Sequence, residues 1–337
     1  MRAFSEFMRR NYFYVILTDL AVGVIVGLFT SRPGEVIRGF NTPLMVLMIA
    51  AMGFTITFRS LSAAITRWRE FLLGFLMNFL FAPVLCWLIA VALLSKHPDF
   101  ATGVILIGVV PCAGMALVWA GLLKADVPLA TVINAATMIA APLLIPLLLG
   151  LLAGAFVKVD ILGMFKTVLM TVLLPVLAGV FLREILQRRL EVKPFVPLMP
   201  AISATAAVFL MFVAVNTAVP AILKNLSLFG PLVGATALVF PLLFVAAYLS
   251  SRRAFGRESS VAITYSAGMK NLPIALGLGV ASFKGLVMLP VAVGFAFQMI
   301  TAVVFYQILT RGTLQIRQNF PALFNSFLDN LNYFFIH

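Results

Sequence analysis

The sequence predicts an all-α polytopic membrane protein with ten transmembrane helices, arranged as two inverted five-helix repeats with broken fourth helices. Hydrophobic residues make up 63% of the 337 positions and charged residues only 10%, against about 25% charged in ordinary globular domains. Ten apolar stretches are long enough to cross about 30 Å of hydrocarbon. One stretch in each half is interrupted midway by helix-breaking or charged residues. These observations exclude a large soluble domain.

The ten stretches are separated by short polar or charged segments. They cover residues 12–30, 42–58, 71–94, 101–123, 129–156, 167–181, 197–223, 228–250, 261–281 and 286–309. The sixth is the shortest and the weakest signal. Arg2, Arg9 and Arg10 precede the first stretch, but no small-residue cleavage pattern closes it, so we predict a first helix rather than a signal peptide.

The distribution of positive charge predicts the orientation. The net charge of +13 would suggest a nucleic-acid partner in a soluble protein, but in a membrane protein the side on which Lys and Arg lie matters more. With the N-terminus inside, the inner segments hold 16 of the 24 Lys and Arg residues and the outer segments 7, and Lys270 lies within the membrane. We therefore expect a cell-membrane protein with both termini cytoplasmic and no nucleic-acid partner.

The two halves show a weak internal symmetry. The first and sixth stretches open near residues 12 and 167, and the breaks at Pro111 and Gly268 both fall in the fourth stretch of their half. Both offsets are about 155 residues. Five spans per half place the second copy upside down, which predicts inverted repeats with broken helices.

The breaks are the predicted solute site. A helix in lipid must satisfy its backbone hydrogen bonds internally, so such interruptions survive only beside a polar cavity, which in secondary transporters binds the substrate or ion. The candidate residues in the breaks are Pro111, Cys112, Gly114, Ser266, Gly268, Lys270, Asn271 and Pro273. Asn134 and Thr137 in the fifth stretch are predicted to face the crossing, and Asn216 in the seventh to face it from the opposite side.

Three of these side chains have two interpretations each. A lysine near the centre of a span costs about 2.5–3.5 kcal/mol, so Lys270 either acts as an ion or meets the solute, or it caps carbonyls freed by Pro273 and the crossing helix. Asp19 either pairs with Lys270 or relays a proton, or it is solvated from one side of the membrane or bonds to Thr18 and the neighbouring helix. Cys112 either contacts the solute or is a small buried packing residue.

An enzyme is not predicted. The spans contain no convincing set of acid, base and nucleophile, no metal-ligand spacing and no Gly-rich phosphate loop, and His97 and His337 lie outside them. Cys86 and Cys112 both lie inside spans, where we expect free thiols. No cofactor is expected besides a coupling ion, either sodium or a proton.

Several motifs carry a family resemblance. Residues 111–119, followed by Leu122, Lys124 and Asp126, resemble the fourth-helix signature of arsenite efflux permeases. Residues 52–57 and 78–83 are similar to the wider superfamily that includes bile acid:sodium symporters. The resemblance implies a panel of helices 1, 2, 6 and 7 (residues 1–65 and 157–225) and a core of helices 3–5 and 8–10 (residues 66–156 and 226–310). Residues 311–337 have the apolar spacing of an amphipathic helix, which we expect to lie at the cytoplasmic membrane surface.

The departures from these families are also informative. Bile acid:sodium symporters have Ser and Asn where this chain has Ala116 and Leu117, so one sodium site is expected to be missing. They have Glu and Gln where this chain has Ser266 and Lys270, so the ammonium is expected to repel a sodium ion or stand in for one. Arsenite permeases carry a Glu at the position of Pro273.

The sequence therefore predicts a secondary active transporter that moves a small, anionic organic solute by alternating access, coupled to sodium or protons. Arsenite efflux using Cys112 is the alternative, and a membrane receptor or scaffold without transport is a third interpretation. The expected partners are the solute and the lipid bilayer. The oligomeric state is left open.

Overall fold

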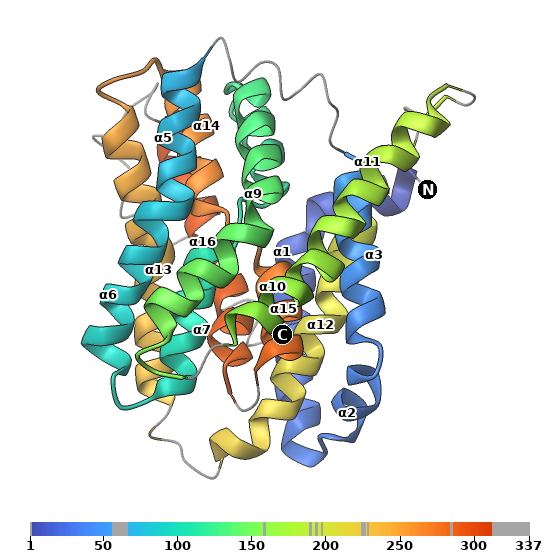
Figure 1. Ribbon diagram of the computed structural model, residues 1–337, viewed down its shortest axis with the longest axis vertical. Helices are drawn as coiled ribbons and strands as arrows, with labels where there is room; N and C mark the ends of the chain where they lie inside the picture. The colour runs from blue at the N-terminus through green and yellow to red at the C-terminus, as the bar shows by residue number, and fades with distance from the viewer. Residues whose placement is uncertain are drawn as a thin grey trace.

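The computed structural model shows an all-helical protein (Figure 1). It describes residues 2–55, 67–157, 160–188, 191–192, 195–196, 198–223, 227, 229–283 and 286–311. Within these residues the only β-structure is an isolated bridge between Cys112 and Lys270. The predicted amphipathic tail lies almost entirely outside the described residues.

The described part of the first half consists of α1 (Arg2–Phe29), α2 (Arg32–Arg38), α3 (Asn41–Gly53), α5 (Trp68–Leu76), the π-helical turn η1 (Met77–Phe81), α6 (Ala82–Leu94), α7 (Pro98–Val109), α8 (Met115–Leu122) and α9 (Val127–Ala153). The second half consists of α10 (Ile161–Val168), the π-helical turn η2 (Leu169–Leu173), α11 (Leu174–Leu186), α12 (Leu198–Leu223), α13 (Phe229–Ser251), α14 (Arg257–Gly268), α15 (Leu272–Ser282) and α16 (Met288–Arg311).

Among the described residues, six helical segments are long and apolar enough to cross a membrane. They are Trp68–Leu94, Val127–Ala153, Ile161–Leu186, Leu198–Pro220, Phe229–Ser251 and Met288–Thr310. The pair Tyr14–Phe29 and Arg32–Arg38, bent by 117°, makes a seventh if it counts as one span. The chain is therefore a multi-pass membrane protein, while ten crossings remain a prediction.

The sixth predicted stretch was too short at both ends. Residues 167–181 were predicted, but the helix runs over Ile161–Leu186 because it continues through charged positions. Arg183 donates from Nη1 to the backbone oxygens of Phe54 (3.1 Å) and Thr55 (2.8 Å), just beyond the end of α3. The last carbonyls of a helix lack partners within that helix, and Arg183 supplies donors for those beyond α3. Because its charge is used in this way, the helix continues past Arg183.

The helices pack in two groups (Figure 1). The first group contains α1, α2, α3, α11 and α12, in which α12 packs against α1, α2 and α3, and α3 against α11. The second contains α5–α9, α13, α14 and α16, in which α13 packs against α6, α14 and α16. α15 packs against α16 of the second group and against α3 and α12 of the first. α10, which the sequence prediction assigned to the panel, packs against α9 of the second group. The panel and core boundaries, and any independent movement of the two parts, therefore remain a prediction.

Charged side chains connect the helices at one end of the second group through an ion pair and hydrogen bonds. Asp126 forms an ion pair with Arg67, and its Oδ1 accepts from the N–H of Leu129 at the start of α9. Arg257 donates to the carbonyls of Leu123 and Leu309, both at 3.4 Å. These contacts join the ends of α5, α8, α9, α14 and α16.

Candidate functional site

The two broken helices meet at their breaks. Pro111 lacks an N–H and cannot continue α7, and Val110 before it is extended (φ −73°, ψ 154°), as residues before proline usually are. The N–H of Ala113 donates to the Met269 carbonyl (2.7 Å), and the N–H of Asn271 donates to the Pro111 carbonyl (2.8 Å). The breaks therefore satisfy each other as a short antiparallel pair.

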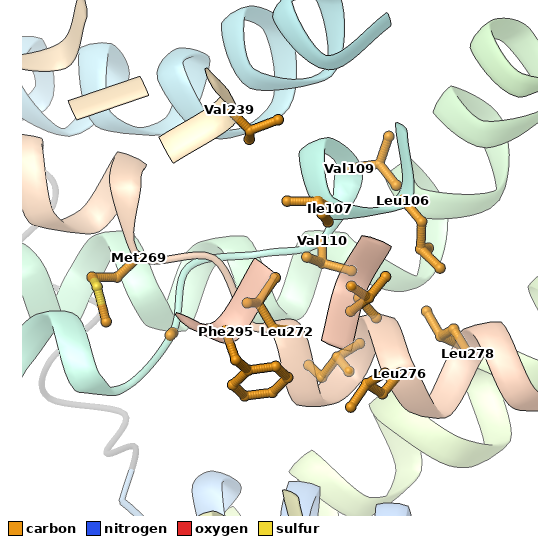
Figure 2. Packing of buried hydrophobic residues seen from close by; sticks show 14 of the residues in the cluster. Leu106, Ile107, Val109, Val110, Val239, Met269, Leu272, Leu276, Leu278 and Phe295 are labelled. Atoms are coloured by element: carbon orange, nitrogen blue, oxygen red, sulfur yellow. The ribbon is translucent and has the colours of Figure 1, made fainter. Parts of the chain in front are cut away.

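The crossing lies deep in an apolar environment. Figure 2 shows the two extended connections running past each other, with Val110 and Met269 on them and Phe295 of α16 nearby. Val109 and Leu272, on either side of the crossing, are fully buried. A buried polar group there is costly unless it finds a hydrogen-bond partner.

The backbone N–H groups of the two bridged residues, Cys112 and Lys270, donate to side-chain oxygens of later helices. The N–H of Cys112 donates to Thr137 Oγ1 of α9 at 3.3 Å. The N–H of Lys270 donates to Gln298 Oε1 of α16 at 2.8 Å. Thr137 was among the predicted site residues, whereas Gln298 was missed. Its sequence signal was an amide inside a largely apolar stretch, which also contains Gln307.

The ammonium of Lys270 is bound by one residue. Lys270 is 0% exposed, and its Nζ donates to the backbone oxygen of Asn78 (3.1 Å) and to Asn78 Oδ1 (3.2 Å). The only ion pair among the described residues is that between Arg67 and Asp126, so no carboxylate partner balances this charge there. The predicted structural alternative named the wrong carbonyls, because the acceptor belongs to η1 rather than to the break at Pro273.

The Asn78 carbonyl is free for a local reason. In the π-turn η1 the backbone bonds reach five residues back, as in the bond from Ala82 N–H to the Met77 carbonyl. By this spacing, residue 83 would donate to Asn78, but Pro83 has no N–H. Asn78 Nδ2 also donates to the carbonyls of Gly74 (2.9 Å) and Ser266 (3.1 Å). Asn78 therefore joins η1 to α14 and to the ammonium, a role that sequence reasoning missed.

Three other predicted residues are buried, and two of them have a polar atom without a hydrogen-bond partner. Asn134 Oδ1 and Ser266 Oγ are buried without a hydrogen-bond partner in the described structure. Cys112 is a fully buried free thiol, and its Sγ lies 3.4 Å from the carbonyl oxygen of Ala113. The structure thus places all three in the protein interior, with polar capacity left over on Asn134 and Ser266.

The other residues of the breaks shape the backbone. Asn271 Oδ1 accepts from the N–H of Ile274 (3.4 Å) and caps α15, and Pro273 lies in the first turn of that helix, where its missing N–H costs nothing. Gly268 lies against the Phe244 ring, which leaves no space for a side chain. Gly114 directly precedes α8.

Two candidates on the first helix group do not contact Lys270. Asp19 on α1 has its Oδ2 buried without a hydrogen-bond partner, and it makes no ion pair with Lys270. Asn216 on α12 accepts from the N–H of Gly34 (2.9 Å) and donates to the Thr30 carbonyl (3.1 Å). It therefore stabilises the bend between α1 and α2 instead of facing the crossing.

Paired broken helices that meet inside a multi-pass helical protein are the arrangement of membrane transporters. Comparison with known families agrees, because residues 42–225, more than half of the chain, match the sodium bile acid symporter family. The chain belongs to this family, whose proteins are transporters and not enzymes.

Individual relatives cover most of the chain. An uncharacterized protein of Bacillus subtilis, YbaS, is 28% identical over 305 residues, which cover 88% of this chain and 96% of that protein. A probable sodium/metabolite cotransporter of Arabidopsis thaliana, BASS1, is 30% identical over 240 residues, covering 71% of this chain and 58% of that protein. The rice protein BASS2, with the same description, is 28% identical over 81% of this chain and 64% of its own length. The matched region is thus less than two thirds of each plant protein.

Proposed function

We propose that this protein is a secondary active transporter for a small anionic organic solute, which it moves across the cell membrane by alternating access with both termini cytoplasmic. The observation that carries the proposal is the buried ammonium of Lys270, held by two Asn78 oxygens beside the crossing of two broken helices. A bound cation would be coordinated by oxygen atoms of the same kind as those that accept from the ammonium.

In this proposal the positive charge of the Lys270 ammonium replaces the charge of a bound coupling cation. Two unit charges about 4 Å apart interact with about 4 kcal/mol at an effective dielectric constant of 20. A second cation beside Lys270 is therefore disfavoured, while an anion near the crossing is favoured. We propose that transport does not require sodium at this position, and that coupling depends more on pH.

We also propose the ten-helix inverted repeat. The bridged residues Cys112 and Lys270 are 158 positions apart, and Thr137 and Gln298, which accept from their N–H groups, are 161 apart. In each half the acceptor belongs to the long helix that follows the broken one. Equivalent hydrogen bonds at nearly equal offsets support two copies of one structural unit.

Arsenite efflux receives no support from the relatives described above. A receptor or scaffold without transport likewise has no specific observation in its favour. Anion transport remains the proposal that the site supports best.

The test is a thermal-stability screen of the purified protein, followed by flux measurements in proteoliposomes. The screen includes mono- and dicarboxylates, taurocholate, arsenite, sodium and a pH series, because a compound that binds the native state raises its apparent stability. We expect a carboxylate to stabilise the protein and to accumulate in vesicles under an ion gradient. Stabilisation by arsenite alone, or no stabilisation and no flux with any anion, would refute the proposal.

A further inference from the structure

α3 carries three buried methionines, and two of them fill glycine positions of the broken helices. A Cβ added at Gly114, just before α8, would collide with Cε of Met52. A Cβ added at Gly277 in α15 would collide with Sδ of Met45. Both contacts run from a helix of the first group to a broken helix. The third methionine, Met48, is also buried, at 1% exposed against 9% for Met52, and contributes none of the atoms nearest to either glycine.

Gly114 is required for space and not for its backbone conformation. Its φ of −59° and ψ of −22° are right-handed helical values that every residue adopts. The position that a side chain would occupy is instead filled by the Met52 methyl group. Gly114 is two residues from Cys112, so the Met52 side chain lies directly beside the crossing.

Methionine suits a contact that forms and breaks. Its unbranched side chain has three rotatable bonds and fits irregular surfaces with little strain. Alternating access requires the first helix group to separate from the crossing on one side at a time. A methionine that fits into a glycine position gives a close contact with no hydrogen bond to break.

We propose that Met52 is the side chain that occludes the solute site in this conformation, with Gly114 as the position that receives it. The proposal rests on the proposed transport function, because it takes the crossing as the solute site. It makes Met52 a determinant of access, and of the size of solute that enters from this side, although Met52 lies on a different helix group from Lys270.

The test measures access to Cys112 and needs no substrate. In a Cys86→Ala background, reaction of Cys112 with a membrane-permeant maleimide is followed in vesicles containing the full-length protein. Met52→Ala should raise the labelling rate roughly tenfold, which corresponds to about 1.4 kcal/mol against the occluded conformer. Met48→Ala, the same change at a buried position of the same helix, should leave the rate unchanged. Equal rates in both variants would overturn the proposal.

A double-mutant cycle provides the second measurement. Gly114→Ala should displace Met52 and also raise the rate, but it should add nothing in the Met52→Ala background, because residues in contact act non-additively. An equal effect of Gly114→Ala in both backgrounds would overturn the proposal. If Met52→Ala does not fold, Met52→Val provides the second background, because it shortens the side chain and keeps it apolar. Labelling that behaves as expected without flux of any solute would contradict the transport function and leave the occluding contact intact.

Discussion

The charge of Lys270 is stabilised inside the protein by a single neighbour. Asn78 supplies both oxygens that accept from the ammonium, and its amide also donates to the Ser266 carbonyl of α14. A hydrogen bond to a charged group contributes about 1.5–3 kcal/mol, and a buried charge that loses its partner is more costly still. The side chain of residue 78 therefore supplies one of the two acceptors of the Lys270 ammonium, and the backbone supplies the other.

Asn78→Ala should lower the stability of the protein by about 2–3 kcal/mol, because it removes the side-chain acceptor and the bond to Ser266. The loss should shrink when Lys270 is also replaced by Gln, since the uncompensated charge is then absent. Apparent thermal stability in detergent measures both effects. Additive losses in the double variant would show that the two residues do not interact.

Thr137→Val should cost about 1–3 kcal/mol of stability, because the buried N–H of Cys112 loses its acceptor while the side chain keeps its shape. Thr131→Val is the matched control on α9, since the Thr131 hydroxyl donates only to the Val127 carbonyl of its own helix. Thermal unfolding of the two variants should differ clearly. The same loss in both would mean that the Thr137 bond to the crossing contributes nothing specific.

At the scale of helices, the sequence predicted the breaks well and their partners poorly. Pro111, Gly268 and Lys270 stand out in apolar stretches because each conflicts with a helix in lipid. Asn78 and Gln298 do not, since a single amide is compatible with a transmembrane helix. That Asn78 meets Lys270, 192 positions away, depends on how helices pack together, which local patterns do not record.

The π-turn η1 provides a prediction at this scale. Pro83→Ala should add an N–H that reaches the Asn78 carbonyl and competes with Lys270 for it, lowering uptake roughly tenfold for a loss of about 1.4 kcal/mol. Pro175→Ala is the control, because η2 has the same spacing, with Leu174 N–H bonded to the Leu169 carbonyl, but no lysine. Uptake in vesicles compares the two. Equal uptake by Pro83→Ala and Pro175→Ala would show that the hydrogen bonding of η1 does not affect the Lys270 site.

At the scale of the whole molecule, the fold separates a group of helices that carries the crossing from a group that covers it. The charged contacts of Asp126 and Arg257 hold one end of the crossing group together, while the contacts of Met45 and Met52 between the groups are apolar. Apolar contacts are non-directional, so they allow sliding at lower cost than hydrogen bonds. This difference between the contacts is compatible with the proposed rigid-body alternating access.

Movement of this kind predicts that solute and labelling are linked. A transported solute should change the rate at which Cys112 reacts with permeant and impermeant thiol reagents, because a ligand shifts populations only when it binds the conformers unequally. Labelling rates in a Cys86→Ala protein, with and without a saturating solute, provide the measurement. A rate that no transported solute changes, from either side, would indicate that the crossing is a static packed core.

The central claim is that the ammonium of Lys270 takes the place of a coupling cation, and sodium dependence tests it most directly. Uptake of the solute identified in the stability screen is measured in proteoliposomes with sodium or with choline, for the wild type and for Lys270→Gln. We expect equal wild-type uptake in both ions, and a Lys270→Gln protein whose uptake and thermal stability both rise with sodium. Wild-type uptake that requires sodium, together with an identical sodium dependence in Lys270→Gln, would contradict the claim.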